Sequence, residues 1–557
     1  MNAPGSVDTL SGIIIIKTME QLKKAFHLLA VLISLAGPAF SQSQSTIKYD
    51  ALLQMIRFGY VDTVNEEQLT EEAIKSVLKK LDPHSVYIPA SELKEMNEPL
   101  VGKFEGVGIQ FNIFEDTILV TQTIAGGPSE KLGIRAGDRI LRIDGENVAG
   151  VKMTNNGVLK RLRGDKGTKV KVEISRRSEP QPLEFLITRD KIPIFSVDAS
   201  YMADQETGYI KISRFADATV EEFKTALEEL KASGMKNLIL DLSGNGGGYL
   251  NRAVELADEF LESDKLIVYT EGVNNPKQEM FSSSVGDFQK GKLIVIIDEY
   301  SASASEIVSG AIQDHDRGLI IGRRSFAKGL VQKPMPLPDG SAVRLTIARY
   351  HTPSGRCIQK PYEKGDEYDD DISNRMKKGE LYHADSIKFV DSLAYKTAAG
   401  RTVYGGGGIM PDVFVPLDTS YSSKYWGELQ RKSLLFEFAL SHTDRNRNEL
   451  LQTYPNINIY KKDFNVSEDM LQQFIAFAEK KGVAFDSAGY ATSKPWIIIQ
   501  LRALIARDLW DMESYFQIVN EKNNFYVAAM RSMYDSTFEK KGVLTDSGKS
   551  KSKSGKK

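Results

Sequence analysis

The chain has 557 residues and a single cysteine, Cys357, so no disulfide bond can form within it. Cys357 has no evident base beside it in the sequence, so we expect a small, partly buried residue rather than a nucleophile. An excess of one charge is also lacking. The net charge is −2 at pH 7, and a nucleic-acid partner is therefore not expected. No group of metal-ligating residues stands out, so we predict neither a metal nor another cofactor.

A long hydrophobic run is missing as well. The apolar stretch 25–36 is too short for a confident membrane span. It follows Lys23 and Lys24 and precedes small residues, an order that predicts a secretory signal peptide over residues 1–41, with Met19 as an alternative start. We therefore expect export to the periplasm or cell envelope, and an uncleaved anchor is the alternative.

The most informative stretch of the sequence is 293–332. The β-branched run 293–298 predicts a buried strand, and an apolar-periodic helix begins at about Ala304. Ser303 lies at the junction, beside the positive end of the helix and its free N–H groups, where many serine nucleophiles are found. Ser303 and Glu306 also fit a capping box, so a simple N-cap is the alternative role.

A lysine follows this helix among apolar and glycine neighbours. Such a residue, Lys328, can lose its charge and act as a base, and together with Ser303 it indicates a serine/lysine hydrolase. A solvated lysine is the alternative, and Ser301 and Ser305 compete for the role of nucleophile. A Ser-His-Asp arrangement would need one of the histidines described next.

Histidine offers a different base. His315 lies about 18 Å along the helix axis from Ser303, which is too far for proton transfer. His84 and His351 would have to be brought in by the fold, and we expect both to be structural.

A second strand-to-helix junction is rich in glycine. The apolar run 237–242 predicts a buried strand, and the turn 243–248 separates it from a helix. No G-K-[ST] sequence follows, which disfavours a phosphate-binding loop. Exposed N–H groups in such a turn fit an oxyanion hole, where one donor is worth about 3–4 kcal/mol in the transition state.

The motif SASASEIVSGAIQDHDR…GRRSFAKGLVQ resembles the signature of the C-terminal processing peptidases, also called tail-specific proteases. In that family the second serine of the SASAS run is the nucleophile, the lysine of [ST]-F-x-K-G is the base, and the glutamine four residues later orients it. The resemblance thus implies these roles for Ser303, Lys328 and Gln332. It covers about residues 48–415, with further matching segments at 81–85, 104–109, 208–212, 352–356 and 407–412.

The resemblance also implies that the N–H groups of Gly247 and Ala304 hold the oxyanion. The family's usual D-L-R-x-N-P-G-G reads DLSGNGGG here. Ser243 replaces the arginine and Gly246 replaces the proline, which predicts a less rigid loop in which the Gly247 donor survives.

The resemblance implies a multidomain α/β protein with a crotonase-like α/β protease core and an inserted PDZ domain. The expected parts are a signal peptide (1–41), an N-terminal helical region (42–100), the PDZ domain (101–192), the protease core (193–415), a C-terminal helical extension (416–545) and a disordered Ser/Lys tail (546–557). The helical regions are expected to pack or to form a homodimer. Peripheral membrane association of the tail is an alternative to a solubilising role.

A PDZ domain binds peptides by β-augmentation, and its loop N–H groups capture a terminal carboxylate. We expect this site at Gly106, Val107, Gly108 and Ile109, and a domain that only packs on the core is the alternative. Arg163, after the domain's helix, is either an interdomain latch or a solvated arginine.

The expected function is therefore endoproteolysis of protein or peptide substrates with free C-termini. One alternative is a pseudo-peptidase that only binds C-termini through its PDZ domain. Another is a crotonase-like enzyme that acts on thioesters.

Overall fold

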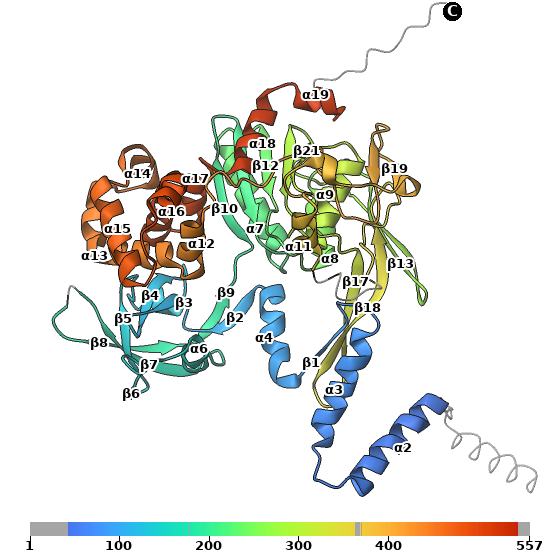
Figure 1. Ribbon diagram of the computed structural model, residues 1–557, viewed down its shortest axis with the longest axis horizontal. Helices are drawn as coiled ribbons and strands as arrows, with labels where there is room; N and C mark the ends of the chain where they lie inside the picture. The colour runs from blue at the N-terminus through green and yellow to red at the C-terminus, as the bar shows by residue number, and fades with distance from the viewer. Residues whose placement is uncertain (1–42, 178, 363–367, 369, 544–557) are drawn as a thin grey trace, which may run out of the picture. The chain divides into compact units, whose positions relative to one another are not determined.

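The computed structural model describes residues 43–177, 179–362, 368 and 370–543 (Figure 1). The expected signal peptide and the Ser/Lys tail lie outside these residues. The chain divides into two compact units, residues 1–77 and 78–557. Across the described ranges, no helix has both the length and the apolar character that crossing a membrane requires.

The described part of the first unit is helical. Helix α2 (Gln44–Gly59) begins after Ser43, whose hydroxyl accepts the Thr46 N–H at 3.2 Å. No residue of α2 is buried. Helix α3 (Glu66–Lys79) follows and ends just beyond the boundary of the unit.

The second unit opens with a short strand, β1 (Val86–Ile88), and helix α4 (Ala90–Val101). Strand β1 pairs with β18 (Ala342–His351), so the region expected to be helical also contributes a strand to a sheet of the core. Pairing over so few residues leaves almost no periodic signal in the sequence.

A small β domain follows α4. Its main sheet has the order β3-β4-β5-β7-β8, with β6 paired to β5, and β2 pairs separately with β9. Strand β3 therefore forms an open edge. The elements are β2 (Lys103–Gly106), β3 (Ile109–Phe114), β4 (Thr117–Thr123), α5 (Pro128–Lys131), β5 (Arg139–Ile143), β6 (Glu146–Asn147), α6 (Asn155–Leu162), β7 (Lys169–Ser175), β8 (Leu183–Thr188) and β9 (Asp190–Pro193).

The core is built on a six-stranded sheet of order β10-β11-β12-β15-β16-β21, in which only the β10–β11 pair is antiparallel. Its strands are β10 (Val197–Met202), β11 (Thr207–Ile212), β12 (Asn237–Asp241), β15 (Leu293–Ile297), β16 (Leu319–Gly322) and β21 (Val413–Phe414). All five residues of β15 are buried, because helices cover both faces of this largely parallel sheet.

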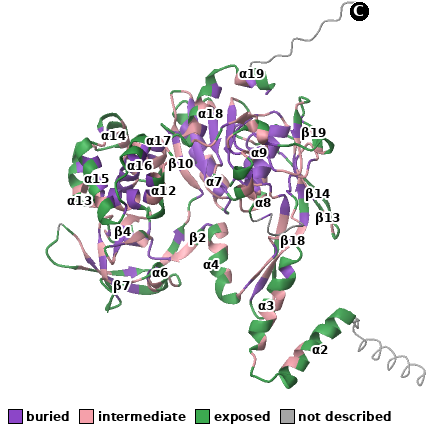
Figure 2. Ribbon diagram, in the orientation of Figure 1, coloured by how far each residue is buried: buried purple, intermediate pink, exposed green. Residues whose placement is uncertain are grey.

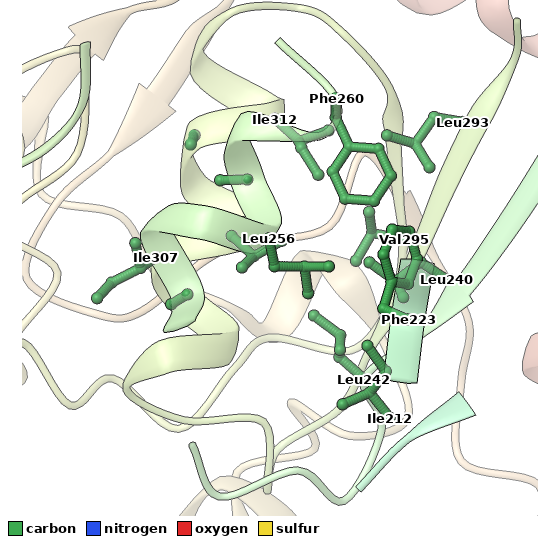
Figure 3. Close-up of a cluster of buried hydrophobic side chains, with 14 of the residues drawn as sticks. Ile212, Phe223, Leu240, Leu242, Leu256, Phe260, Leu293, Val295, Ile307 and Ile312 are labelled. Carbon is green, nitrogen blue, oxygen red and sulfur yellow. The ribbon is translucent and has the colours of Figure 1, made fainter. Parts of the chain in front are cut away.

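One face of the sheet packs against α7 (Thr219–Ala232), α8 (Leu250–Asp258) and α9 (Ala304–Asp314). Figure 3 shows this cluster, in which Leu240 and Val295 of the sheet lie near Phe223 and Leu256 of the helices. Helix α9 is buried along its whole length, and Figure 2 shows the concentration of buried residues around it.

The opposite face carries the alternate residues of the same strands, Ile239, Ile294 and Ile296. It is covered by α18 (Asn524–Tyr534) and α19 (Thr537–Lys541), near the end of the chain. The last helices of the expected C-terminal extension thus pack on the core sheet.

A second, antiparallel sheet borders the core, with β1, β18, β13 (Leu266–Gly272) and β14 (Asn275–Phe281) in order and β17 (Leu330–Pro336) also paired to β18. The segment between β18 and β21 contains α11 (Asp371–Lys377), two short 3-10 helices (Ala384–Ser386 and Asp391–Leu393) and the hairpin of β19 (Ala394–Lys396) with β20 (Thr402–Tyr404).

The remaining helices form a separate apolar cluster. They are α12 (Lys424–Arg431), α13 (Leu434–Thr453), α14 (Ile457–Asp463), α15 (Glu468–Lys480), α16 (Ser487–Leu509) and α17 (Met512–Val519). The expected mixed α/β architecture is confirmed by these observations, while the crotonase-like character of the core stays a prediction.

Candidate active site

The turn between β15 and α9 presents Ser303 in a strained conformation. Its φ is 54° and its ψ is −111°, a region that costs a residue with a side chain about 1–3 kcal/mol. A sharp, strained strand-to-helix turn is how a serine nucleophile is exposed in other hydrolases. Ser303 is half-buried, whereas Ser301 and Ser305 are fully buried.

The two competing serines are committed to structural bonds. The Ser301 hydroxyl donates to the Leu242 carbonyl at 2.8 Å, and the Ser305 hydroxyl donates to the Asn245 carbonyl at 2.9 Å. Both bonds tie the serine turn to the Gly-rich loop. The geometry therefore favours Ser303 among the three serines.

Lys328 lies in the loop before β17. Its Nζ donates to Gln332 Oε1 at 3.0 Å, and Gln332 Nε2 in turn donates to the His84 carbonyl. Burial lowers the pKa of Lys328, and the nearby charge of Arg344 lowers it further. The ammonium bonds to Gln332 rather than to the Ser303 hydroxyl here, and catalytic bonds of this kind often tighten only when substrate is present.

Glu306 joins the serine turn to the lysine loop. Its Oε2 accepts the N–H groups of Ser303 at 2.8 Å and Lys328 at 2.9 Å, and its Oε1 accepts the N–H of Ala327 at 2.7 Å and the Ser325 hydroxyl at 2.5 Å. Burial raises the pKa of this carboxyl group, although the donors oppose the effect. The sequence showed Glu306 only as a capping residue, so its role toward the lysine loop was missed.

Tyr350 connects the same two segments from the second sheet. Its hydroxyl bonds to the Ser303 carbonyl at 3.1 Å and to the Lys328 carbonyl. The ring is buried, and burial raises the pKa of the phenol well above its ordinary value. The spacing of Ser303 and Lys328 is therefore fixed from two sides.

The segment 81–85 supports Gln332. Asp82 Oδ1 accepts the N–H groups of His84 and Ser85, each at 2.8 Å, and the Thr346 hydroxyl at 3.1 Å. This network holds the His84 carbonyl where Gln332 Nε2 donates to it. The sequence alone predicted no such role for this segment.

The three histidines all have other partners. His84 Nε2 bonds to the Tyr368 hydroxyl at 2.6 Å, and burial together with the charge of Lys328 lowers the pKa of its imidazole to about 4. His315 Nε2 bonds to a backbone carbonyl at 2.7 Å. The His351 ring stacks on Tyr269 at 4.6 Å. The structure places none of them in a hydrogen bond with Ser303.

A buried lysine from a neighbouring strand contacts the start of the Gly-rich loop. Lys211 of β11 donates from Nζ to Asp241 Oδ1 at 3.1 Å and to Ser243 Oγ at 2.9 Å. Ser243 is the position at which the family usually has arginine, so Lys211 brings a positive charge to the same place.

Gly247 lies directly against the serine turn. A Cβ on this residue would come within 2.8 Å of the Ser303 Cβ and 3.0 Å of the Ala304 nitrogen, and its φ of +99° also requires glycine. The Gly247 N–H was expected to face an oxyanion, but it donates to Asn245 Oδ1 at 2.9 Å. The Asn245 amide is held by its own bond to the Ile212 carbonyl at 2.9 Å.

The second expected oxyanion donor is free. The Ala304 N–H, at the first position of α9, has no hydrogen-bond acceptor among the described residues. A helix N-terminus favours negative charge, so this donor suits a developing alkoxide.

Ser303, Lys328, Gln332, Gly247 and Tyr350 line one cavity of about 470 Å³. Its walls come from α4, the Gly-rich loop, the serine turn and α9, the lysine loop, and strands β17 and β18. The lining residues are Asn97, Leu100, Val101, Gly246, Gly247, Gly248, Tyr249, Leu250, Ser303, Ile307, Lys328, Leu330, Val331, Gln332, Pro334, Arg344 and Tyr350. The lining contains no aspartate or glutamate.

The expected peptide-binding loop of the small β domain also has free donors. Within the domain, the Val107 carbonyl accepts hydrogen bonds from Ser129, and the Gly108 carbonyl accepts one from the Ile124 N–H. Within the described part of the chain, the N–H groups of Val107 and Gly108 have no acceptor. Ile109 then begins the open edge of β3, and Gly106 ends β2.

Arg163 contacts the helix that leads into this domain. Its Nη1 donates to Glu98 Oε2 of α4 at 2.6 Å, and its guanidinium lies 5.0 Å from the centre of the Phe104 ring. Asn97 and Leu100 of the same helix line the cavity of Ser303. Arg163 therefore contacts α4, a helix that itself lines the cavity of the candidate site.

Cys357 is half-buried, and burial raises the pKa of its thiol, which disfavours the thiolate that a cysteine nucleophile needs.

Comparison with known proteins gives three family matches. Residues 206–369 match peptidase family S41, residues 119–176 match the PDZ domain, and residues 425–511 match a family of unknown function (DUF8443). The first two matches agree with the parts of the chain described above.

Curated relatives extend the similarity. The carboxy-terminal-processing protease of Bartonella bacilliformis is 37% identical over 317 residues, which are 56% of this chain and 72% of the relative. The carboxy-terminal processing protease CtpB of Bacillus subtilis is 36% identical over 333 residues, 58% of this chain and 69% of the relative. Among known structures, the photosystem II D1 C-terminal processing protease is 25% identical, covers 68% of this chain and 88% of its own, and has a TM-score of 0.35.

Proposed function

This chain belongs to the carboxy-terminal processing proteases of peptidase family S41, serine peptidases, and we propose that Ser303 is its nucleophile and Lys328 its general base. The observation that carries the proposal is a single cavity. It brings a strained, half-buried serine together with a lysine whose pKa is lowered by burial.

The reaction follows from these positions. Neutral Lys328 takes the proton of Ser303 Oγ, and the oxygen attacks the scissile carbonyl carbon. The Ala304 N–H stabilises the resulting oxyanion, and Gly247 joins it when its N–H leaves Asn245. Protonated Lys328 then gives its proton to the leaving amine, and water hydrolyses the acyl-enzyme. Gln332 orients the lysine throughout.

The PDZ domain supplies the substrate. An extended peptide adds to the β3 edge at Ile109, and its terminal carboxylate accepts the free N–H groups of Val107 and Gly108. Gly106 and Gly108 leave room for the approaching backbone. The substrates of this proposal are proteins and peptides with free C-termini.

The cellular setting is part of the same proposal. The charge and apolar pattern of residues 1–41 supports export to the periplasm or cell envelope. The exposed apolar residues of α2, such as Leu52 and Phe58, support a homodimer formed through this helix. Peripheral membrane association through residues 546–557 is a weaker alternative to a solubilising tail.

A second function has one observation in its favour. The Gly247 N–H is engaged by Asn245, so one oxyanion donor is not free, which is what a catalytically weak protein that only binds C-termini would show. The two functions differ in whether peptide bonds are cut.

The decisive experiment incubates the full chain with an unfolded protein such as casein and maps the new termini by mass spectrometry. Wild type should cut and Ser303→Ala should not, while the neighbouring Ser305→Ala should retain most activity. Equal cutting by Ser303→Ala would reject the proposed nucleophile. Absence of cutting by wild type, with retained peptide binding, would support the binding-only function.

A further inference from the structure

One cation of the cavity has no task in the proposed reaction. Arg344 of β18 is half-buried and lines the cavity with Lys328. Its guanidinium makes no hydrogen bond or ion pair with any residue that the structure describes. Buried arginines elsewhere in the core are paired, as Arg323 is with Glu299 at 2.7 Å and Arg356 with an aspartate at 2.8 Å. Arg344 is therefore free to bind an anionic group of a molecule that enters the cavity.

Strand register places Arg344 near Gln332, the residue to which Lys328 donates. Gln332 lies opposite Thr346, and Pro334 lies opposite Arg344, in the antiparallel pairing of β17 with β18. Alternate residues of a strand share a face, so Arg344 lies on the Gln332 side and about 7 Å further along. An extended substrate advances about 3.3 Å per residue, which makes this distance roughly two residues.

Among the charged groups around the cavity, Arg344 is the one available to bind an anion. Lys328 is neutral when it acts as a base, and its pKa is lowered by burial first and by Arg344 second. Glu306 is fully occupied by the Ser303 turn and the lysine loop. Asp82 is occupied by Ser85 and Thr346. No carboxylate of the protein competes for Arg344 within the lining.

We propose that Arg344 is a specificity-determining residue that binds a carboxylate of the substrate near the scissile bond. This carboxylate belongs either to an acidic side chain or to the terminus of the substrate itself. The guanidinium fork matches a carboxylate in two-point contact, which a lysine at this position would not reproduce. The proposal rests on the function proposed above for Ser303 and Lys328.

The test uses pairs of internally quenched peptides with the full chain. The members of a pair differ only by Glu or Gln at one position, from three residues before to three residues after the cut, and all have the same free C-terminus. A further pair ends two residues after the cut as a free acid or as an amide. Wild type should show a kcat/KM ratio of about 10 at one position, or for the terminal pair, because a partly exposed charged contact is worth about 1.4 kcal/mol.

Arg344→Gln should bring this ratio to about 1, and Arg344→Glu should invert it in favour of the Gln-containing peptide. The matched control is Arg349→Gln, which removes an exposed arginine of the same strand that bonds to Tyr362 at 3.2 Å. The control should keep the wild-type ratio. Because a ratio within one variant cancels the amount of folded enzyme, partial misfolding cannot produce this pattern.

A second readout is the pH profile. Arg344→Gln removes a positive neighbour of Lys328, whose other titratable neighbours are the carboxylates of Glu306 and Asp82 and the neutral imidazole of His84, so the acid limb of kcat/KM should move to higher pH. A ratio near 1 for every wild-type pair, or a wild-type ratio that persists in Arg344→Gln, would overturn the proposal. If wild type cuts none of the peptides, the proposed chemistry fails. Binding of the same pairs to Ser303→Ala then still decides whether Arg344 selects a carboxylate.

Discussion

Replacing Glu306 with glutamine keeps the shape of the side chain and removes its charge where the serine turn meets the lysine loop. In the wild-type chain Oε2 accepts the N–H groups of Ser303 and Lys328, at 2.8 and 2.9 Å. Oε1 accepts the Ala327 N–H at 2.7 Å and the Ser325 hydroxyl at 2.5 Å. Donors surround both oxygens, so we treat this carboxylate as ionised although burial raises its pKa.

Glutamine has to turn its NH2 group toward one of these pairs of donors. The orientation toward Ser325 does least harm, because that hydroxyl can rotate and accept, but the Ala327 N–H then loses its acceptor. A buried N–H without a partner costs about 1–3 kcal/mol, and the two remaining bonds weaken because their acceptor is neutral. We expect the free energy of unfolding to fall by about 2–4 kcal/mol. We also expect kcat to fall at least about tenfold, because Ser303 and Lys328 lose their common anchor.

The pH dependence of activity provides a second test of the role of Glu306. The negative charge of Glu306 raises the pKa of Lys328, against the larger effects of burial and Arg344. Without that charge the lysine stays neutral to lower pH, so the acid limb of kcat/KM should move down, opposite to the shift expected for Arg344→Gln.

The assay combines thermal unfolding with kcat/KM of one quenched peptide between pH 5 and 10, a range that brackets both shifts. Glu299→Gln is the control, because Glu299 is buried in the same turn and pairs with Arg323 at 2.7 Å. It should lose stability and keep the wild-type pH profile. Wild-type stability and an unmoved profile in Glu306→Gln would refute the reasoning.

The remaining predictions concern the base, the tail site and the latch. Lys328→Ala and Lys328→Arg should both abolish casein cleavage, because alanine has no base and a guanidinium does not release its proton. Wild-type activity should rise with pH through a pKa below that of a free lysine. An active Lys328→Arg variant would mean that another base is used. Peptides with a free C-terminus should bind the full-length Ser303→Ala chain about tenfold more tightly than their amides, as measured by fluorescence anisotropy, and equal affinities would exclude carboxylate capture. Arg163→Ala loses the bond to Glu98 and should lower the turnover of short peptides severalfold with tail binding unchanged. Arg161→Ala, which removes the pair with Glu146 and a bond to the Gly157 carbonyl, contacts within the PDZ domain rather than to α4, should leave both unchanged, and identical kinetics of the two variants would reject the latch.

The sequence predicted elements wherever a local pattern was strong. The β-branched run 293–298 became β15, and the helix expected from Ala304 begins there. The apolar run 237–242, expected to be a buried strand, became β12 (Asn237–Asp241). Each of these elements is defined by its own apolar period, so no distant contact is needed to recognise it.

Features that depend on distant contacts were not predictable in this way. Strand β1 is defined by its pairing with β18, some 250 residues later, and the sequence 86–88 alone does not show this. Helix α18 has an apolar face, but the period of that face does not say that it covers the core sheet. Glu306 was visible as a helix cap, whereas its bond to the Lys328 loop arises only when the chain folds.

Ser243, where the family usually has arginine, shows that a change in a motif cannot be interpreted without the fold. Lys211 lies opposite Asp241 in the parallel pairing of β11 with β12, so its ammonium reaches Asp241 and Ser243 at the end of the strand. A cation from the neighbouring strand thus does what an arginine in the loop would do. The missing arginine is therefore no argument for a lost activity.

The case for a binding-only protein then depends on the Gly247 N–H, which Asn245 occupies at 2.9 Å. When a substrate oxyanion forms, the Gly247 N–H would leave Asn245 and donate to the oxyanion instead. The exchange of neutral bonds costs little, about 1 kcal/mol or less, and a charged oxygen accepts a stronger bond than the Asn245 amide does. The exchange becomes favourable as charge develops, which is when the reaction needs the donor. An engaged Gly247 is therefore compatible with an active peptidase, and the balance of the site favours cleavage over binding alone.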